Sequence, residues 1–160
     1  MANFIDLAVF ENLSNLEIWG GEYYSSNMFF LLETMGHNLT CLHLCHVEQL
    51  SSQSLLHLAS HCHGLREIRL ESCSWELFDI ENTNEENLEN EERKDFKMLL
   101  GLTILNFIPR ELLILLVSRA PNLKYLNLDG EENIDNEIIE TILKKNKLLN
   151  FENLLVYNSR

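Results

Sequence analysis

Two cysteines and a histidine alternate in one short segment of the sequence: Cys41, His43 and Cys45. If this segment is a strand, the three side chains share one face. Thiolates and imidazoles are ligands that zinc prefers, and a structural site needs about four of them in a tetrahedral arrangement. Further candidates follow along the chain: His46, His61, Cys62 and His63. On a flat strand, however, the first and last of the three alternating residues lie too far apart to share one ion easily. We therefore expect neither a metal nor another cofactor.

A nucleophilic pair is the second chemistry that this segment suggests. Cys45 and His43 would share a face as a thiol and its base, but the sequence shows no third group to orient the histidine. A phosphate-cradling glycine-rich loop and the H-E-x-x-H and G-x-S-x-G signatures are also absent from the sequence. We therefore do not expect an enzyme.

The same segment belongs to a frame, Leu-x-x-Leu-x-Leu, that recurs along the chain. Its cleanest copy is Leu65, Ile68 and Leu70. The other copies are Leu13, Leu16, Ile18; Leu39, Leu42, Leu44; Leu99, Leu102, Ile104; Leu123, Leu126, Leu128; and Phe151, Leu154, Val156. The first members are separated by 26, 26, 34, 24 and 28 residues. Such a period is typical of a solenoid of repeated units, and it extends over 1–160 as a single domain.

Alternation within each copy predicts a strand whose leucines face inward. Because one such strand cannot bury its apolar side alone, the copies must stack into a parallel sheet of about six strands. Helices are expected near 26–35, near 52–62 with Ser51 or Ser52 as N-cap, after Pro109 in a first helical turn, and after Asp135 as N-cap. The last of these helices should bury Ile139, Ile142 and Leu143.

One complete unit is visible at 50–73, LSSQSLLHLASHCHGLREIRLESC. It resembles the cysteine-containing leucine-rich repeats, in which a helix and the following strand each end in a cysteine, here Cys62 and Cys73. The segment 120–128, APNLKYLNL, resembles the same junction with Ala120 replacing the first cysteine. Other units carry Gly21, Val47 and Phe107 where the second cysteine would stand. The resemblance implies a ribonuclease-inhibitor-like fold. This is a right-handed α/β leucine-rich-repeat solenoid, with a parallel sheet on the concave face and helices on the convex face.

Such repeats are similar to those of F-box proteins, which hold substrates for a cullin–RING ubiquitin ligase. The resemblance implies a protein-interaction module that recognises substrates in a ubiquitin-ligase adaptor. The segment 108–113, IPRELL, superficially resembles an F-box opening, but it fits the repeat frame and lacks the later Trp-containing helix. We expect no F-box in this chain, so contacts with cullin–RING subunits would require one elsewhere. The alternative is a non-ligase leucine-rich-repeat protein that binds or inhibits a basic partner.

The outward strand positions should form the binding surface on the concave face. The expected partner-binding residues are Glu17, Trp19, His43, Arg69, Glu71, Tyr125, Asn127, Asp129 and Tyr157. Trp and Tyr are frequent anchors in protein interfaces. Acids outnumber the single arginine in this set, which favours a basic protein partner.

The overall charge of the chain also favours a basic partner. The chain has 25 Asp and Glu against 12 Lys and Arg, a formal net charge of −13. This argues against nucleic acid and anionic membranes as partners, because both require cations on the protein. Seven acids gather in an insertion at 81–95, which we expect to be either a solvated surface or an acidic docking segment.

The chain ends suggest where the protein works. No signal-peptide pattern occurs, and no apolar run approaches the ~20 residues of a membrane span. A cytoplasmic or nuclear location with reduced cysteines is therefore expected. Apolar residues lie close to both ends, so we expect the repeat array to be incomplete at both ends or covered there by self-association.

Overall fold

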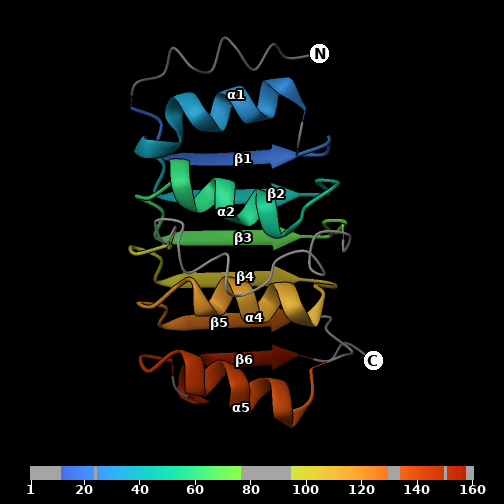
Figure 1. Ribbon diagram of the computed structural model, residues 1–160, viewed down its shortest axis with the longest axis vertical. Helices are drawn as coiled ribbons and strands as arrows, with labels where there is room; N and C mark the ends of the chain where they lie inside the picture. Colours follow the sequence, from blue (N-terminus) through green and yellow to red (C-terminus); the bar gives the residue numbers. More distant parts are fainter. Residues whose placement is uncertain (1–11, 24, 77–94, 130–133, 150, 158–160) are drawn as a thin grey trace.

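The computed structural model describes residues 12–23, 25–76, 95–129, 134–149 and 151–157. These residues form a six-stranded parallel sheet in which the order of strands in space follows their order in the chain (Figure 1). The strands are β1 (Asn15–Trp19), β2 (Cys41–Cys45), β3 (Glu67–Glu71), β4 (Gly101–Leu105), β5 (Tyr125–Asp129) and β6 (Leu154–Tyr157). The expected α/β class, with parallel strands alternating with helices, is confirmed.

Helices connect most of the strands. They are α1 (Ser26–Met35), α2 (Ser52–His61), α4 (Arg110–Ser118) and α5 (Asn136–Lys145), with short 3₁₀ segments η2 (Gly36–Asn38) and η4 (Phe151–Asn153). The caps explain where two of them begin: Ser51 forms a capping box with Ser54, and the Asp135 carboxylate accepts from the Ile138 backbone N–H. Pro109 is the N-cap residue and not part of the first turn, because its backbone is still extended at ψ 137°.

Strand pairing has no slip in register, so alternate positions keep to the same face from β1 to β6. The leucine positions of the frame are buried, for example Leu42, Ile68, Leu70 and Leu126. They join the apolar faces of the helices in one hydrophobic core, and Figure 1 shows α2 and α4 lying over the sheet on this side. In α5 the buried residues are Ile138 and Ile142, whereas Ile139, expected to be buried, is half-exposed.

The backbone repeats the same contacts from unit to unit. The first strand residue donates to the carbonyl just before the preceding strand in four junctions: Cys41 to Ser14, Glu67 to Thr40, Gly101 to Arg66, and Tyr125 to Leu100. The residue after each of four strands has a positive φ: Gly20 (73°), His46 (53°), Ser72 (51°) and Asn106 (76°). Each of these four also donates to the last carbonyl of the next strand. Units of different sequence therefore share one backbone geometry.

The repeat cysteines differ in burial. Cys62 is fully buried and packs so closely on Gly36 that a Cβ there would lie 2.6 Å from its sulfur. Cys73 is only half-buried, and its Sγ lies 3.4 Å from the Leu44 carbonyl oxygen, to which it donates. Cys45, an outward position by simple alternation, is fully buried. It is the last residue of β2, where the chain changes direction at His46, so alternation no longer determines exposure there.

The acidic insertion and the chain ends fall mostly outside the described residues. Residues 81–94 of the insertion belong to this part, as do the expectations for 1–11 and 158–160. The described end of the insertion, Asp95, is not a solvated acid: it forms an ion pair with Arg119 at 3.5 Å, and both side chains are largely buried. Among the described residues, no helix combines the length and hydropathy that crossing a membrane requires.

Candidate interaction surface on the exposed sheet face

The strand side chains that point away from the helices line a groove of about 910 Å³. We call this side the exposed face. Register sets its middle row across the strands: Glu17, His43, Arg69, Thr103, Asn127 and Leu155. Four of the nine predicted contact residues therefore share one row, because alternation in every strand starts from the same register.

His43 occupies the centre of an ionic cluster on β1–β3. Its Nδ1 lies 3.0 Å from Glu17 Oε1, and its Nε2 lies 3.3 Å from Glu71 Oε2. Arg69 Nη2 lies 3.0 Å from the same Glu71 oxygen. A neutral imidazole has one N–H and could donate to only one carboxylate, whereas the imidazolium donates to both. The cluster therefore holds its carboxylates in fixed positions at one end of the groove.

Trp19 extends from this cluster into solvent. Its side chain is 67% exposed, the largest value among the exposed apolar residues of the described part. The indole N–H donates to Glu17 Oε1 at 2.7 Å, and the ring meets His43 edge-on with centroids 6.4 Å apart. The polar end of the indole is held while most of its apolar surface is exposed, so Trp19 resembles the rigid aromatic anchors common in protein interfaces.

A second aromatic lies on the far side of the groove. Tyr125, on β5, is 58% exposed. Four strand intervals across the sheet and four residues along the strands separate it from Trp19, so the two residues lie roughly 23 Å apart. Leu155, on β6, is a further exposed apolar residue here at 45%, and it was not among the predicted contact residues. Tyr157 pairs with Asp129 through the backbone, and its side chain lies outside the described part.

Asn127 differs from its expected exposure. It is half-buried, and its Oδ1 is buried without a hydrogen-bond partner among the described residues. Buried acceptors are rarely left unpaired in folded proteins. Asn127 lines the groove, so an N–H donor of a bound partner could reach this oxygen.

Negative charge dominates the groove. Its described acidic lining residues are Glu17, Glu67 and Glu152, with Glu71 beside them in the ionic cluster. Arg69 is the cation among the lining residues, and Glu71 already pairs with it. The groove therefore complements a positively charged surface.

The exposed face also brings His43, Cys45 and Glu71 together, with one possible metal-ligand atom of each within 4.8 Å of the others. Cys41 is not part of this group, in agreement with the expectation that three alternating residues on one strand cannot converge. Burial raises the pKa of the Cys45 thiol, and the nearby Glu71 and Glu17 carboxylates raise it further. The thiolate is the form that binds metal or attacks an electrophile, so this environment disfavours both chemistries at Cys45.

A second cluster, formed by Glu33, His57 and His61, lies between α1 and α2. Of these three residues, only His61 was predicted from the sequence as a candidate metal ligand. The available signal was the spacing of the two histidines, four residues apart in a segment expected to be helical, which places both on one helix face. Glu33 comes from a different unit, and only packing of the helices brings it close.

No model of a known protein family matches the chain, and no curated protein matches its sequence.

Proposed function

We propose that this chain is a leucine-rich-repeat interaction module that folds as a right-handed solenoid, with the groove on its concave face. Support for the repeat architecture comes from the backbone. Six parallel strands follow one another in order, and the same carbonyl contacts and the same positive-φ position recur at successive junctions. A shared geometry in units of different sequence is what a stack of repeats requires.

The partner of this module is a protein with a basic, extended segment. The observation that carries this proposal is an acid-rich groove with one exposed aromatic, Tyr125, in its lining and another, Trp19, two residues beyond its lining residue Glu17 on β1. An extended chain of about seven residues spans the roughly 23 Å between them. Lysine or arginine side chains of such a segment would pair with the carboxylates and stack on the aromatic rings. One of their N–H groups would satisfy the Asn127 oxygen.

The cellular role that we favour is substrate recognition in an F-box/LRR-type ubiquitin-ligase adaptor of the cytoplasm or nucleus. In this role the module holds the substrate, and cullin–RING subunits bind through an F-box outside this chain. The second candidate is a non-ligase leucine-rich-repeat protein that binds or inhibits a basic partner, and the acid-rich groove favours it equally. Neither role uses catalytic residues of this chain.

Affinity purification from cells with quantitative mass spectrometry tests the surface. The double variant Trp19→Ala/Tyr125→Ala should capture few of the proteins that the wild-type chain captures. Truncation of an interface anchor typically weakens the binding free energy by ~2 kcal/mol or more. Phe30→Ala is the matched control, since Phe30 is an exposed aromatic on α1, away from the groove. Equal capture by the double variant and the wild type would refute the assignment.

The same experiment separates the two roles. Cullin and RING subunits recovered with a longer form of the protein would support the ligase adaptor. Recovery of a basic partner without ligase subunits, from every form, would favour the non-ligase role.

A further inference from the structure

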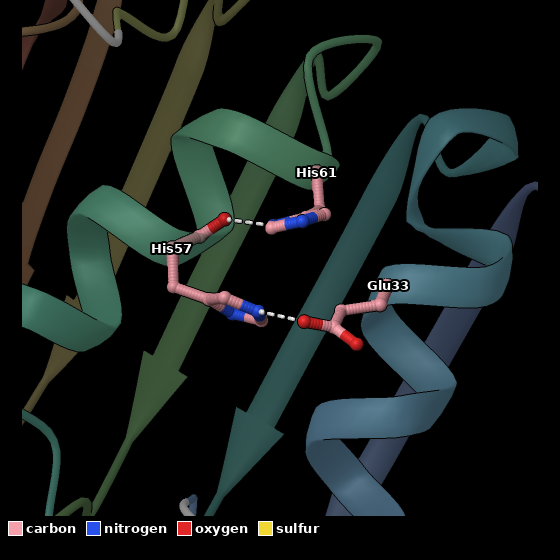
Figure 2. Close-up of side chains that lie close together, drawn as sticks. All are labelled: Glu33, His57 and His61. Carbon is pink, nitrogen blue, oxygen red and sulfur yellow. Dashed lines mark hydrogen bonds and ion pairs between the residues drawn. The ribbon is translucent and has the colours of Figure 1, made fainter.

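Glu33, His57 and His61 form a cluster on the helix-covered side of the sheet, away from the groove. Glu33 extends from α1, and the two histidines lie one turn apart on α2; the His57 ring points towards the Glu33 carboxylate, and the His61 ring lies beside the His57 carbonyl oxygen (Figure 2). One possible ligand atom from each residue lies within 4.8 Å of those of the other two. The three residues therefore converge from consecutive units of the sheet.

Hydrogen bonds determine which nitrogen of His57 carries the proton. The Tyr23 hydroxyl lies 3.1 Å from the Ser54 carbonyl oxygen and 2.9 Å from His57 Nδ1. Because a carbonyl can only accept, both contacts are hydrogen bonds at the same time only when the single hydroxyl proton goes to Ser54. The hydroxyl oxygen then accepts from Nδ1–H of His57. In the neutral ring this leaves the lone pair on Nε2.

That lone pair faces a carboxylate. His57 Nε2 lies 3.7 Å from Glu33 Oε1, which is longer than a hydrogen bond. An imidazole nitrogen and a carboxylate oxygen attract each other only when a cation lies between them, either a proton on the nitrogen, as in an ion pair, or a bound metal ion. Two ligands each ~2.1 Å from a tetrahedral zinc ion are separated by roughly 3.4 Å, close to the distance observed here.

A hydrogen bond also fixes the position of the proton on His61, which can supply a second nitrogen ligand. Its Nδ1 lies 3.1 Å from the His57 carbonyl oxygen, which can only accept, so Nδ1 carries the proton. Nε2 of His61 is then the nitrogen able to bind a metal. A hydrogen bond from the second ring nitrogen to a carbonyl or similar group is the usual support of a metal-binding histidine.

The site is rigid on one side and open on the other. The His57 side chain is only 10% exposed, and its ring stacks on Phe29 with centroids 3.8 Å apart. The Glu33 side chain is 45% exposed, so solvent reaches the carboxylate. An ion can enter from this side, and water can complete its coordination.

We propose that Glu33, His57 and His61 bind a divalent transition metal, with Zn²⁺ as the ion that this ligand set and geometry suit best. Two imidazole nitrogens and a carboxylate oxygen form a three-ligand set that leaves one position for water. Bound there, the ion links α1 to α2 and hence the first unit to the second. This site is independent of the groove on the exposed face.

Zinc titration of the full chain, after removal of metals with a chelator, tests the proposal. We expect binding of one zinc ion per chain by calorimetry and a rise in Tm that saturates at one equivalent. Tyr23→Phe should weaken binding ~10–100-fold, the range for a supporting residue, and Glu33→Gln and His61→Gln should weaken it further. His63→Gln is the matched control because His63 is an exposed histidine outside the cluster, and its affinity should equal that of the wild type.

Cobalt(II) substitution identifies the ligands. A tetrahedral cobalt spectrum without a thiolate charge-transfer band should appear in the wild type and disappear in Glu33→Gln. Glu33 is largely exposed, so this variant should fold even if a histidine variant does not. Absence of zinc binding would overturn the proposal. Binding that survives in Glu33→Gln and His61→Gln but fails in His43→Gln would also overturn it, because the ion would then belong to the exposed face.

Discussion

His43 and His57 are both largely buried histidines that lie against carboxylates, His43 on the exposed face of the sheet and His57 on α2 on the helix-covered side. Both ring nitrogens of His43 face acids, Glu17 on one side and Glu71 on the other. His57 faces one acid, Glu33, through Nε2, and its Nδ1 is engaged by the Tyr23 hydroxyl. The two environments therefore differ in the group at Nδ1, which is a carboxylate for His43 and a hydroxyl for His57.

That group changes what the imidazole can do. Each ring nitrogen of His43 lies within 3.3 Å of a carboxylate oxygen, so the ring is part of an ionic cluster. A hydroxyl that accepts from Nδ1–H of His57 leaves the Nε2 lone pair of the neutral ring available to a metal ion. The group at Nδ1 therefore distinguishes the ionic cluster of the exposed face from the proposed metal site between α1 and α2.

The largest expected effect concerns the difference between the buried side and the exposed side of β3. Leu70 is buried and its neighbour Arg69 is exposed. Leu70→Ala should lower the free energy of unfolding by about 2–5 kcal/mol, because it leaves a cavity in the core. Arg69→Ala should change it by less than about 0.5 kcal/mol. Urea denaturation measures both, and a larger effect at Arg69 would contradict the orientation of the sheet.

The aromatic residues beside the two histidines provide a second, smaller test. Tyr23→Phe removes a buried hydroxyl and leaves the Ser54 carbonyl without that donor, so it should destabilise the fold by about 1–3 kcal/mol. Trp19→Phe removes an exposed indole N–H and should cost less than about 0.5 kcal/mol. Thermal unfolding of the two variants compares them directly. Equal losses would mean that both clusters are equally important for folding.

Cys62 in the core and Cys41 on the exposed face should differ in how they make the stability of the fold depend on pH. Burial raises the pKa of Cys62 from 9.0 to about 12. Because the folded state keeps this proton longer than the unfolded chain does, the stabilisation is complete below pH 9 and is lost as pH rises towards 12. From pH 9 to pH 10 the loss from this thiol should be about 1 kcal/mol.

Cys62→Ala should remove this loss of stability above pH 9, because alanine has no thiol to titrate. Alanine fits at this position because Ala120 occupies the corresponding place in another unit. Cys41→Ala is the control on the exposed face, where burial and Glu67 raise the pKa of a half-buried thiol. The free energy of unfolding, followed from pH 8 to pH 10, should depend less on pH in Cys62→Ala than in Cys41→Ala. Identical slopes would show that Cys62 does not titrate as its burial requires.

Much of the fold could be predicted because its signals are local. The leucine frame locates the strands, and Ser51 and Asp135 mark helix starts through contacts within one turn. Failures occurred where position depends on distant segments or on the end of an element. Cys45 is buried at the end of its strand, and α5 is rotated so that Ile138 replaces Ile139 in the core.

The two candidate sites also differ in how far they could be predicted from the sequence. The outward strand positions follow from alternation and register, so Glu17, His43, Arg69 and Asn127 could be placed in one row of the exposed face in advance, although Asn127 is less exposed than alternation suggests. The α1–α2 cluster could not be found in this way. Glu33 and His57 are far apart in the sequence, and only the stacking of two units places their side chains 3.7 Å apart.

The central claim is that the exposed face binds the partner. Hydroxyl-radical footprinting of a captured complex tests this claim most directly. Trp19 and Tyr125 are highly exposed and reactive on one side of the molecule, and Phe30 and Met98 are exposed outside the groove lining. We predict that the partner protects Trp19 and Tyr125 and leaves the oxidation of Phe30 and Met98 unchanged. Protection of Phe30 with continued oxidation of Trp19 and Tyr125 would contradict the account and place the interface on the helices.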